Sequence, residues 1–374
     1  MKVGIVCAFD TYFDRVSLLK EYYEEKGASV EVYSSDFSHR KKVKIPMQSP
    51  VTLQIPTLPY QKNLSFARIR SHIHFSKDVL RKIHSQTFDR LHVLIPCNSL
   101  AKTMSIYKKK HPQTQLIFDI IDLWPETMPI SRWKDHFPFT VWKNTRDRYL
   151  NIADLVYTEC DLFQEVLNQE DNPKFHTLYW ARQEMPLQAK LDLKDHEISF
   201  CYLGSMNNII DIQFIASLCA ACTEYKKVKL HLIGDGESKD ELVQNVKSKG
   251  VEVIDHHKIF DQQEKQRIFD QCHFGLNVMK ENVVVGLTMK SLDYMCGQLP
   301  IINTIPGDTK DFCEKENIGF HVPHDQIHQM AKVICNQTIQ ENYNQRENIK
   351  SLYLRYFTKQ SFFNEINQIE SMIK

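Results

Sequence analysis

The feature that most constrains the fold of this 374-residue chain is a regular alternation of short apolar segments with helical segments. The alternation starts at residue 2 and starts again at residue 198. Apolar segments of four to eight residues that alternate with helices are typical of parallel sheets covered by helices. The sequence therefore predicts an α/β protein with two parallel sheets. The expected strands are residues 2–9, 28–35, 91–97, 115–121, 153–160, 198–205, 228–236, 251–255, 274–279 and 300–305.

The chain is too long for one ordinary core, so we expect two domains. A polar segment that contains Pro186, residues 183–197, is the expected linker. We place the N-terminal domain at 1–185 and the C-terminal domain at 196–350, followed by a terminal helix over 351–374. Most of the eleven glycines lie after residue 200, several at predicted strand ends. Because ligands bind at the carboxyl ends of parallel strands, the C-terminal domain is the better candidate for nucleotide binding.

Charge and composition narrow the class of protein. Lys and Arg (47) nearly balance Asp and Glu (46), which argues against a general nucleic-acid binder. No apolar run approaches the roughly 20 residues of a membrane span, and the first residues are typical of a buried strand and not of a signal peptide. Ten scattered cysteines indicate reduced thiols and a cytoplasmic location, and we interpret Cys219 and Cys222 as core residues and not as a metal or redox pair.

The segment VVGLTMKSLDYMCGQLPII, residues 284–302, is the strongest candidate for a ligand site. Gly286, Leu287 and Thr288 form a turn, and free N–H groups at the helix start that follows suit a phosphate. Lys290 is the expected phosphate ligand, and Asp293, one turn further, is the expected ribose ligand. The alternative is a buried helix whose Lys290 extends its charge to solvent.

Two other turns follow predicted strands of the same domain. Gly204 and Ser205 lie after the first strand, where a glycine allows a phosphate to approach the backbone. Gly234 and Asp235 follow the next strand and are candidates for a base or ribose contact. The Gly-Asp-Gly turn lacks the third glycine of a dinucleotide-binding motif. Both segments are also compatible with ordinary strand-to-helix turns.

The segment FDIIDLWPET, residues 118–127, ends a predicted strand with carboxylates and an indole. Carboxylates bind sugar hydroxyls, and an aromatic ring stacks on the apolar face of a sugar. Asp119, Asp122, Trp124 and Glu126 are therefore candidates for sugar recognition or catalysis. A proline turn with a buried tryptophan would produce the same pattern.

Helical spacing places Arg68 and His72 on one face of the segment KNLSFARIRSHIHFSKDVL, residues 62–80. Arg68 or Arg70 could hold an anionic group, and His72 could hydrogen-bond an acceptor, although a lone histidine is more often structural. Residues 130–150 interleave aromatic and basic side chains, which suits either a membrane interface or a pair of helices with an aromatic core. These side chains are Trp133, Lys134, Phe137, Phe139, Trp142, Lys143, Arg146 and Arg148.

With these motifs in place, the chain resembles bacterial glycosyltransferases of the GT-B architecture, which have two Rossmann-like domains. The closest resemblance is to the family 4-like enzymes of capsule and exopolysaccharide synthesis, and it covers nearly the whole chain. The segments that carry it are KNLSFARIRSH, DLWPET, ADLVYTEC, YLGSMNNIIDI, IGDGE, GLTMKSLDYMCGQLPIINTIPGD and the terminal helix.

The resemblance implies transfer of a sugar from a nucleotide diphosphate sugar, expected to be a UDP-sugar, with retention and without a metal or cofactor. The donor would bind the C-terminal domain, and the acceptor the N-terminal domain through Arg68, His72, Trp124 and Glu126. The terminal helix would cross back to the N-terminal domain. Asp293 occupies the position of the family's ribose-binding glutamate, but the glutamate eight residues earlier is Val285 here.

A further departure is that Ser205, Met206 and Asn207 replace the Arg and Lys that often follow the first strand of the nucleotide domain. Lys290 is therefore the expected partner of the leaving diphosphate, while Asp119 or Asp122 would orient the acceptor or the transferred sugar. A glycan or lipid-linked oligosaccharide is the expected acceptor, with peripheral contact to the inner face of the membrane. The sequence leaves the oligomeric state open. The alternatives are a nucleotide-sugar epimerase and a non-catalytic partner of an active transferase, which the missing glutamate favours.

Overall fold

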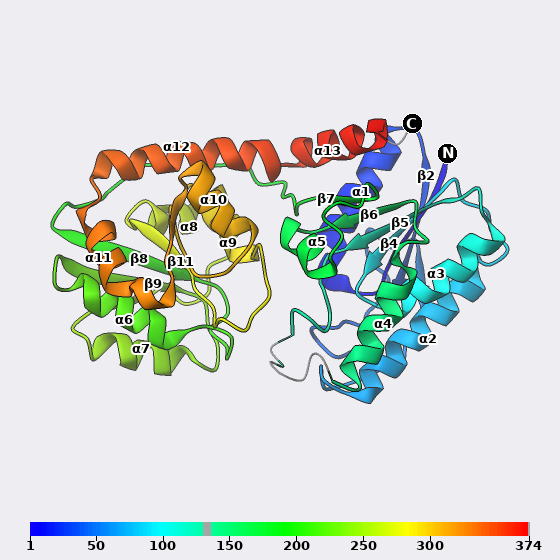
Figure 1. Cartoon of the computed structure of the whole chain (residues 1–374), viewed down its shortest axis with the longest axis horizontal. Helices are drawn as coiled ribbons and strands as arrows, with labels where there is room; N and C mark the ends of the chain where they lie inside the picture. The colour runs from blue at the N-terminus through cyan, green and yellow to red at the C-terminus, as the bar shows by residue number, and fades with distance from the viewer. Residues whose placement is uncertain (129, 131–135, 373–374) are drawn as a thin grey trace. The chain divides into compact units, whose positions relative to one another are not determined.

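A computed structural model describes residues 1–128, 130 and 136–372, and all structural statements below concern these residues. The chain divides into two compact units (Figure 1). The N-terminal unit consists of Met1–Ala181 together with Phe362–Lys374, and the C-terminal unit consists of Arg182–Ser361. The structural division thus falls just before the predicted boundary at 185. The final helical segment is shared between the units and does not form a separate part.

The N-terminal unit contains a parallel sheet of seven strands in the described residues, in the order β3-β2-β1-β4-β5-β6-β7. In its centre, Val3 of β1 is paired with Val30 of β2 and with Arg90 of β4. The central strands are buried almost throughout, which explains their continuous apolar sequence. The strands are β1 (Lys2–Cys7), β2 (Ser29–Ser35), β3 (Leu53–Ile55), β4 (Arg90–Ile95), β5 (Gln115–Ile120), β6 (Leu155–Thr158) and β7 (Phe175–Thr177).

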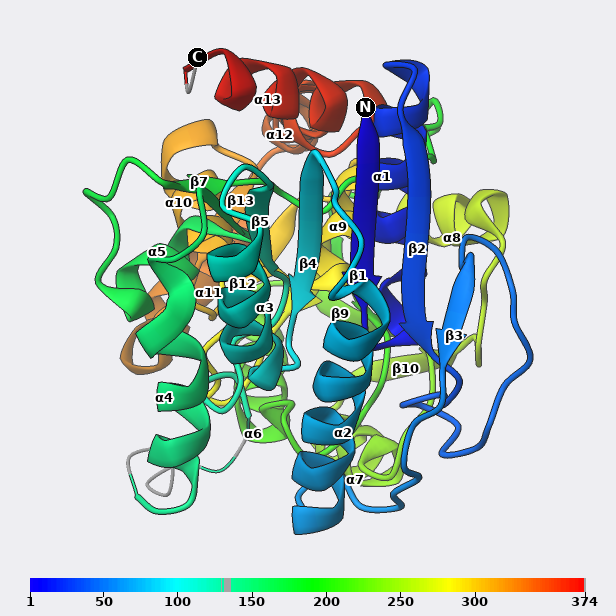
Figure 2. The same ribbon diagram turned by 90° about the vertical axis from the view of Figure 1, so that its right-hand side faces the viewer.

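Helices cover both faces of this sheet. Figure 2 shows α2, α3 and α4 side by side on one face, and Figure 1 shows α1 on the other. Ser65 caps α2 by accepting a hydrogen bond from the Arg68 N–H at 3.2 Å, which fixes where that helix begins. The helices are α1 (Phe13–Glu25), α2 (Phe66–Ile83), α3 (Ser99–Lys110), α4 (Phe139–Leu150), α5 (Asp161–Leu167) and the short η1 (Asp10–Tyr12).

The C-terminal unit repeats this plan with a parallel sheet of six strands in the described residues, ordered β10-β9-β8-β11-β12-β13. Phe200 of β8 is paired with Leu230 of β9 on one side and with Phe274 of β11 on the other. The strands are β8 (Glu197–Leu203), β9 (Lys227–Ile233), β10 (Glu252–Asp255), β11 (Phe274–Asn277), β12 (Ile301–Asn303) and β13 (Gly319–His321).

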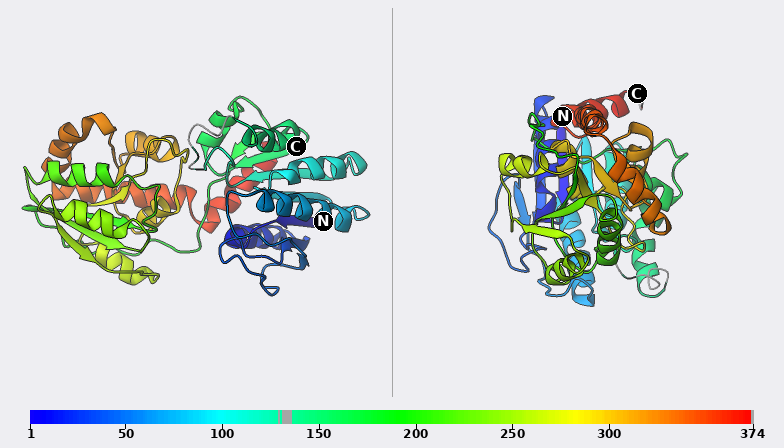
Figure 3. Two further views of the ribbon diagram at one scale, coloured as in Figure 1. Left: turned by 90° about the horizontal axis from the view of Figure 1, so that it is seen from below. Right: turned by 90° about the vertical axis from the view of Figure 1, so that its left-hand side faces the viewer.

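Helices again lie on both faces of the sheet (Figures 1 and 3). Asp211 begins α6 by accepting from the Phe214 N–H at 2.9 Å. Cys219 and Cys222 of α6 are both buried in the core cluster of this unit. The helices are α6 (Ile212–Cys222), α7 (Lys239–Lys247), α8 (Gln262–Phe269), α9 (Met289–Cys296), α10 (Asp308–Glu316), η3 (His324–Gln326), α11 (Ile327–Asn336) and α12 (Ile339–Tyr356).

The prediction of one terminal helix over 351–374 is wrong. The segment contains the end of α12 and a separate helix, α13 (Lys359–Met372). The helix is interrupted because Arg182 pairs with Thr358 as in a parallel bridge: its N–H donates to Phe357 and its carbonyl accepts from Lys359. Beyond this interruption α13 packs within the N-terminal unit, where Asn367 and Phe363 contact Tyr22 of α1.

The sequence interpretation also missed the short edge strands β3, β7 and β13 and the helix α3. Each of these strands has only three residues, too few to show a periodic pattern. In the described part of the chain, no helix combines the length and apolar character that a membrane crossing would require.

Candidate functional site

Each sheet reverses its strand order once. The reversal lies between β1 and β4 in the N-terminal unit, and between β8 and β11 in the C-terminal unit. In open parallel sheets, ligands bind in the crevice outside the carboxyl ends of the strands at such a reversal. The residues that follow these four strands therefore define one candidate site in each unit.

Lys290 of α9 reaches the reversal point of the C-terminal unit. Its Nζ donates to the Tyr202 hydroxyl at 2.9 Å and lies 4.3 Å from the centroid of that ring. Tyr202 belongs to β8, and its hydroxyl donates in turn to the Ser205 carbonyl at 3.3 Å. No carboxylate within the described ranges forms an ion pair with Lys290. Burial lowers the pKa of Lys290 to about 7, so binding of an anion there would favour its charged form.

The turn before Lys290 is built mainly by contacts within the protein. Thr288 caps α9, since its Oγ1 accepts from the Ser291 N–H at 3.0 Å and donates to Asn277 Oδ1 at 2.9 Å. The Gly286 carbonyl accepts from the backbone N–H and the hydroxyl of Thr309. Leu287 is buried. These residues position the start of α9. Lys290 is the charged side chain of this segment that has no oppositely charged partner in the described structure.

Asp293 lies on the same helix as Lys290 but contacts a different part of the unit. Its carboxylate pairs with Lys265 of α8 at 2.9 Å and with Arg182 at 3.4 Å. A small recess there is also lined by Gln262 and Cys296. The two expected ligands therefore have different partners: Lys290 contacts Tyr202, whereas Asp293 is paired with two cations.

The Ser205 carbonyl accepts from the Tyr202 hydroxyl, which Lys290 also contacts, and Gly204 directly precedes Ser205. A side chain at Gly234 would place its Cβ 2.0 Å from the Gly204 carbonyl oxygen, so that glycine is required by the close approach of two loops. Asp235 is exposed and pairs with Lys258 at 3.2 Å. Gly204 and Ser205 are thus placed at the site, whereas Gly234 has a sufficient structural explanation.

Arg68 of α2 lies at the carboxyl edge of the N-terminal sheet. Its guanidinium stacks on Trp124, which follows β5, with 3.7 Å between the guanidinium carbon and the ring centroid. Its Nη1 donates to the Asn63 carbonyl at 3.0 Å, while Nε and Nη2 are buried and have no hydrogen-bond partner among the described residues. The side chain is 2% exposed. Burial lowers the pKa of Arg68 from its ordinary value, but an arginine keeps its charge.

His72, one turn along α2, is enclosed by aromatic rings. Its ring lies 5.3 Å from Phe9, which follows β1, and stacks at 6.1 Å on Trp124. Tyr60 and Trp142 lie within 6.3 Å of it. Both ring nitrogens lack a partner within the described ranges, and burial lowers the pKa of His72 well below its ordinary range, which keeps the ring neutral. The structure therefore brings together three of the four predicted acceptor ligands, Arg68, His72 and Trp124.

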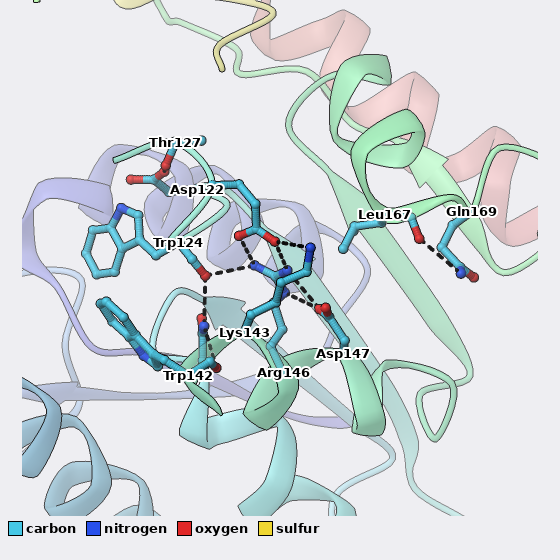
Figure 4. Close-up of polar contacts among 11 residues, drawn as sticks. Asp122, Trp124, Thr127, Trp142, Lys143, Arg146, Asp147, Leu167 and Gln169 are labelled. Carbon is cyan, nitrogen blue, oxygen red and sulfur yellow. Dashed lines mark hydrogen bonds and ion pairs between the residues drawn. The ribbon is translucent and has the colours of Figure 1, made fainter. Parts of the chain in front are cut away.

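Glu126, the fourth, forms a separate ion pair. It accepts from Arg146 of α4 at 2.8 and 3.1 Å, and Lys143 lies 3.2 Å away. Burial opposes ionisation, but the Arg146 contacts hold the pKa of Glu126 below its ordinary value. Figure 4 shows Arg146 between the Trp124 carbonyl and Asp147. Glu126 therefore anchors the loop after β5 to α4.

Asp122 and Asp119, the two predicted catalytic carboxylates, have different environments. Asp122 accepts from the Thr127 hydroxyl, and burial raises its pKa above the ordinary value (Figure 4). Asp119 is completely buried and accepts two hydrogen bonds of 2.8 Å from Arg15 and one of 3.2 Å from His92. Although burial opposes it, the charge of Arg15 lowers the pKa of Asp119. Asp119 thus stabilises the core, and Asp122 lies at the sheet edge.

The aromatic-basic segment is partly buried where it is described. Trp142 and Arg146 are buried, which agrees with the core alternative for these two residues. Trp133 and Lys134 lie outside the described residues. Phe137, in contrast, is 77% exposed.

Sequence reasoning missed several residues of both sites. Tyr202 was included only in a strand, and nothing in its local sequence indicates that it contacts Lys290 across 88 positions. Phe9, His39 and Tyr60 were missed because they come from three different loops. A signal for Phe9 was available, since it ends the first predicted strand, and ligand contacts are expected at the carboxyl ends of strands.

Residues 197–337 match the family model of the group 1 glycosyl transferases. This segment lies inside the C-terminal unit and makes up less than half of the chain. The comparison with curated proteins gave no match.

The whole chain is similar in structure to known glycosyltransferases. The apo form of the lipopolysaccharide outer core galactosyltransferase WaaB has a TM-score of 0.70 at 13% identity, with 100% of this chain and 99% of that chain covered. Anabaena Alr3699/HepE in complex with UDP has a TM-score of 0.68 at 13% identity, with 100% of both chains covered. WaaG, a glycosyltransferase of lipopolysaccharide biosynthesis, has a TM-score of 0.63 at 11% identity, with 98% and 99% covered.

At these identities the structural similarity establishes the fold. It confirms the prediction of two Rossmann-like units of the GT-B architecture. Together with the domain match, it supports the prediction of a glycosyltransferase.

Proposed function

We propose that the chain transfers a sugar from a nucleotide diphosphate sugar, with UDP as the expected carrier, to a glycan or lipid-linked acceptor in cell-surface polysaccharide synthesis. The observation that carries the proposal is Lys290, a cation without a carboxylate partner in the described structure, placed at the sheet edge inside the segment that matches the group 1 glycosyl transferases. A half-buried amine without a counter-ion is unfavourable in its charged form unless a ligand completes the site. The UDP bound to HepE supports a nucleotide ligand for this fold.

Chemically, the diphosphate leaves with growing negative charge as the bond to the sugar breaks. Lys290 would stabilise that charge most in the transition state, where it is largest, and would thereby raise the rate. Retention of configuration and independence from a metal ion are carried over from the family resemblance. Determination of the product anomer by NMR, and an assay with and without EDTA, test these two points.

The acceptor would bind the N-terminal unit at Arg68, His72 and Trp124. A lipid-linked acceptor is supported by apolar side chains that are exposed near the N-terminal ends of α2 and α4. Leu64 and Phe66 are 53% and 74% exposed, and Phe137 and Val141 are 77% and 57% exposed. Exposed aromatic and aliphatic residues beside lysines are typical of contact with a membrane interface.

One observation favours a different role, that of a non-catalytic nucleotide-sugar-binding partner of an active transferase. Val285 replaces a family glutamate, and Asp293, at the position of the other, is occupied by Arg182 and Lys265. Such a protein would bind the nucleotide without turnover. Product formation by the purified chain alone would exclude it.

The test begins with a thermal-shift screen of UDP, ADP, GDP and dTDP and their sugars. A ligand present at 100 times its Kd should stabilise the folded state by about 2.7 kcal/mol. Sugar transfer is then measured with the nucleotide sugar that binds. If none of the nucleotides raises the melting temperature, the proposal is contradicted.

A further inference from the structure

Arg68 differs from the other deeply buried arginines of the N-terminal unit. Arg15 pairs with Asp119, and Arg146 pairs with Glu126 and Asp147, so both have full counter-ions. Arg68 has one hydrogen bond, to a backbone carbonyl, and no carboxylate of the described chain lies within ion-pair distance of it. A buried guanidinium with two unused donor nitrogens has an unmet requirement for an acceptor.

The neighbouring groups of α2 share this requirement. Both ring nitrogens of His72 and the hydroxyl of Ser71 are buried and have no partner in the part of the chain that the structure describes. His72 is neutral, so one of its nitrogens donates and the other accepts. Five polar atoms without a partner in the described structure thus come from three residues of one helix, which lie within about one turn of one another.

The carboxylates around this cluster are already engaged. Asp122 accepts from Thr127, and Asp10 accepts from the Ser38 hydroxyl at 2.6 Å and from the His39 N–H. A second cation, Lys42, lies 4.7 Å from the centroid of Tyr60. Both carboxylates therefore already accept hydrogen bonds, and within the described residues neither forms an ion pair with Arg68, although the charge of Asp122 acts on it from a greater distance.

The geometry also defines how a ligand would meet Arg68. Trp124 covers a face of the guanidinium at 3.7 Å, so the free donors Nε and Nη2 lie on its edge. Two parallel N–H groups on the edge of a guanidinium match the two oxygens of a carboxylate or phosphate. Trp124 and the rings around His72 are aromatic groups of the kind on which a sugar stacks, although Trp124 is only 7% exposed.

From these observations we infer that the acceptor is an anionic glycan, whose carboxylate or phosphate binds the edge of Arg68 while His72 donates a further hydrogen bond. The inference rests on the proposed function in assigning this ligand as acceptor. The charged group has two sources with the same chemistry, an acidic sugar and a phosphate that links the glycan to its carrier.

The experiment measures binding of small probes to the full-length chain by calorimetry, with no nucleotide present. The probes are methyl β-glucuronide, its neutral counterpart methyl β-glucoside, and glucose 1-phosphate. We expect both anionic probes to bind at least tenfold more tightly than the neutral one. Arg68→Met should remove that preference, whereas Arg70→Met, which changes an exposed arginine of the same helix, should leave it unchanged. The anionic probe that binds more tightly identifies the source of the charge.

Lys290→Met separates this inference from the proposed function. The variant should lose UDP binding and keep the preference for anionic probes. If UDP does not bind the native chain but the Arg68-dependent preference is present, the donor proposal fails and the anion site stands. Equal binding of charged and neutral probes, or a preference that survives in Arg68→Met, overturns the inference.

Stability measurements test whether Arg68 has a purely structural role. Without ligand, Arg68→Met should melt at the same temperature as the native chain or higher, because it removes an uncompensated buried charge. A clear fall in melting temperature would instead show that Arg68 stabilises the fold, and would contradict the inference. Arg68→Lys keeps the charge but loses the two parallel N–H donors of the guanidinium, so it should bind the anionic probes with intermediate affinity.

Discussion

The carboxyl edges of the two sheets each carry a basic side chain that is unpaired within the described residues, but the two side chains differ in chemistry. Each leaves one basic side chain without a carboxylate in the described structure, Arg68 in the N-terminal unit and Lys290 in the C-terminal unit. Arg68 is permanently charged and held flat against Trp124, whereas burial lowers the pKa of Lys290 to about 7. The N-terminal unit also shows the contrasting case, since Arg146 has two carboxylates.

The comparison teaches that burial alone does not distinguish a functional cation from a structural one. The difference lies in the partners. Arg146 and Arg68 are both buried at the same sheet edge, but only Arg146 is neutralised by the protein. The predictions below test that distinction.

The largest effect should come from breaking the paired cation. Arg146→Met removes the two hydrogen bonds of the main counter-ion of Glu126 and leaves Lys143 as its remaining cation in the described structure, which should cost stability near the lower end of about 3–5 kcal/mol. Chemical denaturation of the full chain measures the change. Arg148→Met is the matched control, because Arg148 lies on the exposed side of the same helix. If Arg146→Met were as stable as Arg68→Met, the proposed difference between the paired and the unpaired arginine would be contradicted.

Removal of the unpaired lysine should instead affect function. Lys290→Met keeps much of the side-chain volume, and it should reduce UDP affinity and sugar transfer by about 100-fold or more, as for loss of one transition-state donor. The folded state should be as stable as before, because no ion pair is lost. Lys249→Met, at an exposed position, is the control. Normal UDP binding by Lys290→Met would refute the phosphate role.

The pH dependence of ligand binding should differ between the Lys290 site and the Arg68 site. The diphosphate favours the charged lysine, so nucleotide-sugar affinity should fall by up to about tenfold per pH unit above pH 7. Without ligand, the unfolded chain binds more protons than the folded chain between pH 7 and about 10, so this lysine makes stability rise with pH over that window. Binding of the anionic probes at Arg68 should lack this dependence.

Calorimetry of nucleotide-sugar binding at pH 7.5 and 8.5 checks the slope. Lys290→Met is the control, since any remaining affinity in that variant should not change with pH. The same slope in both proteins would mean that another group titrates.

The smallest effect concerns the exposed apolar side chains. Replacing Phe66 and Phe137 by serine should weaken binding to anionic lipid vesicles several-fold, without changing nucleotide affinity. Phe260→Ser is the matched control, because Phe260 is 87% exposed in the C-terminal unit. Co-sedimentation with vesicles measures the effect, and an equal loss in the control would exclude a dedicated membrane contact.

Much of the fold follows from local patterns. The buried strands of both sheets are short apolar runs, and the ends of several helices follow from capping residues such as Asp211 and Thr288. The three-residue strands β3, β7 and β13 escape such reasoning because their pairing is decided by neighbouring strands and not by their own sequence. The interruption between α12 and α13 depends on Arg182, which is distant in sequence.

The candidate sites divide in the same way. Periodicity and turn residues act over a few positions, so two parallel α/β units and the chemical types at their strand ends can be predicted from the sequence alone. The folded arrangement is needed to see that Asp119 and Glu126 are held by arginines, while Arg68 and Lys290 have no counter-ion in the described chain. The physical reason is that ion pairing and desolvation depend on distances between segments far apart in the sequence, and local patterns carry no information about those distances.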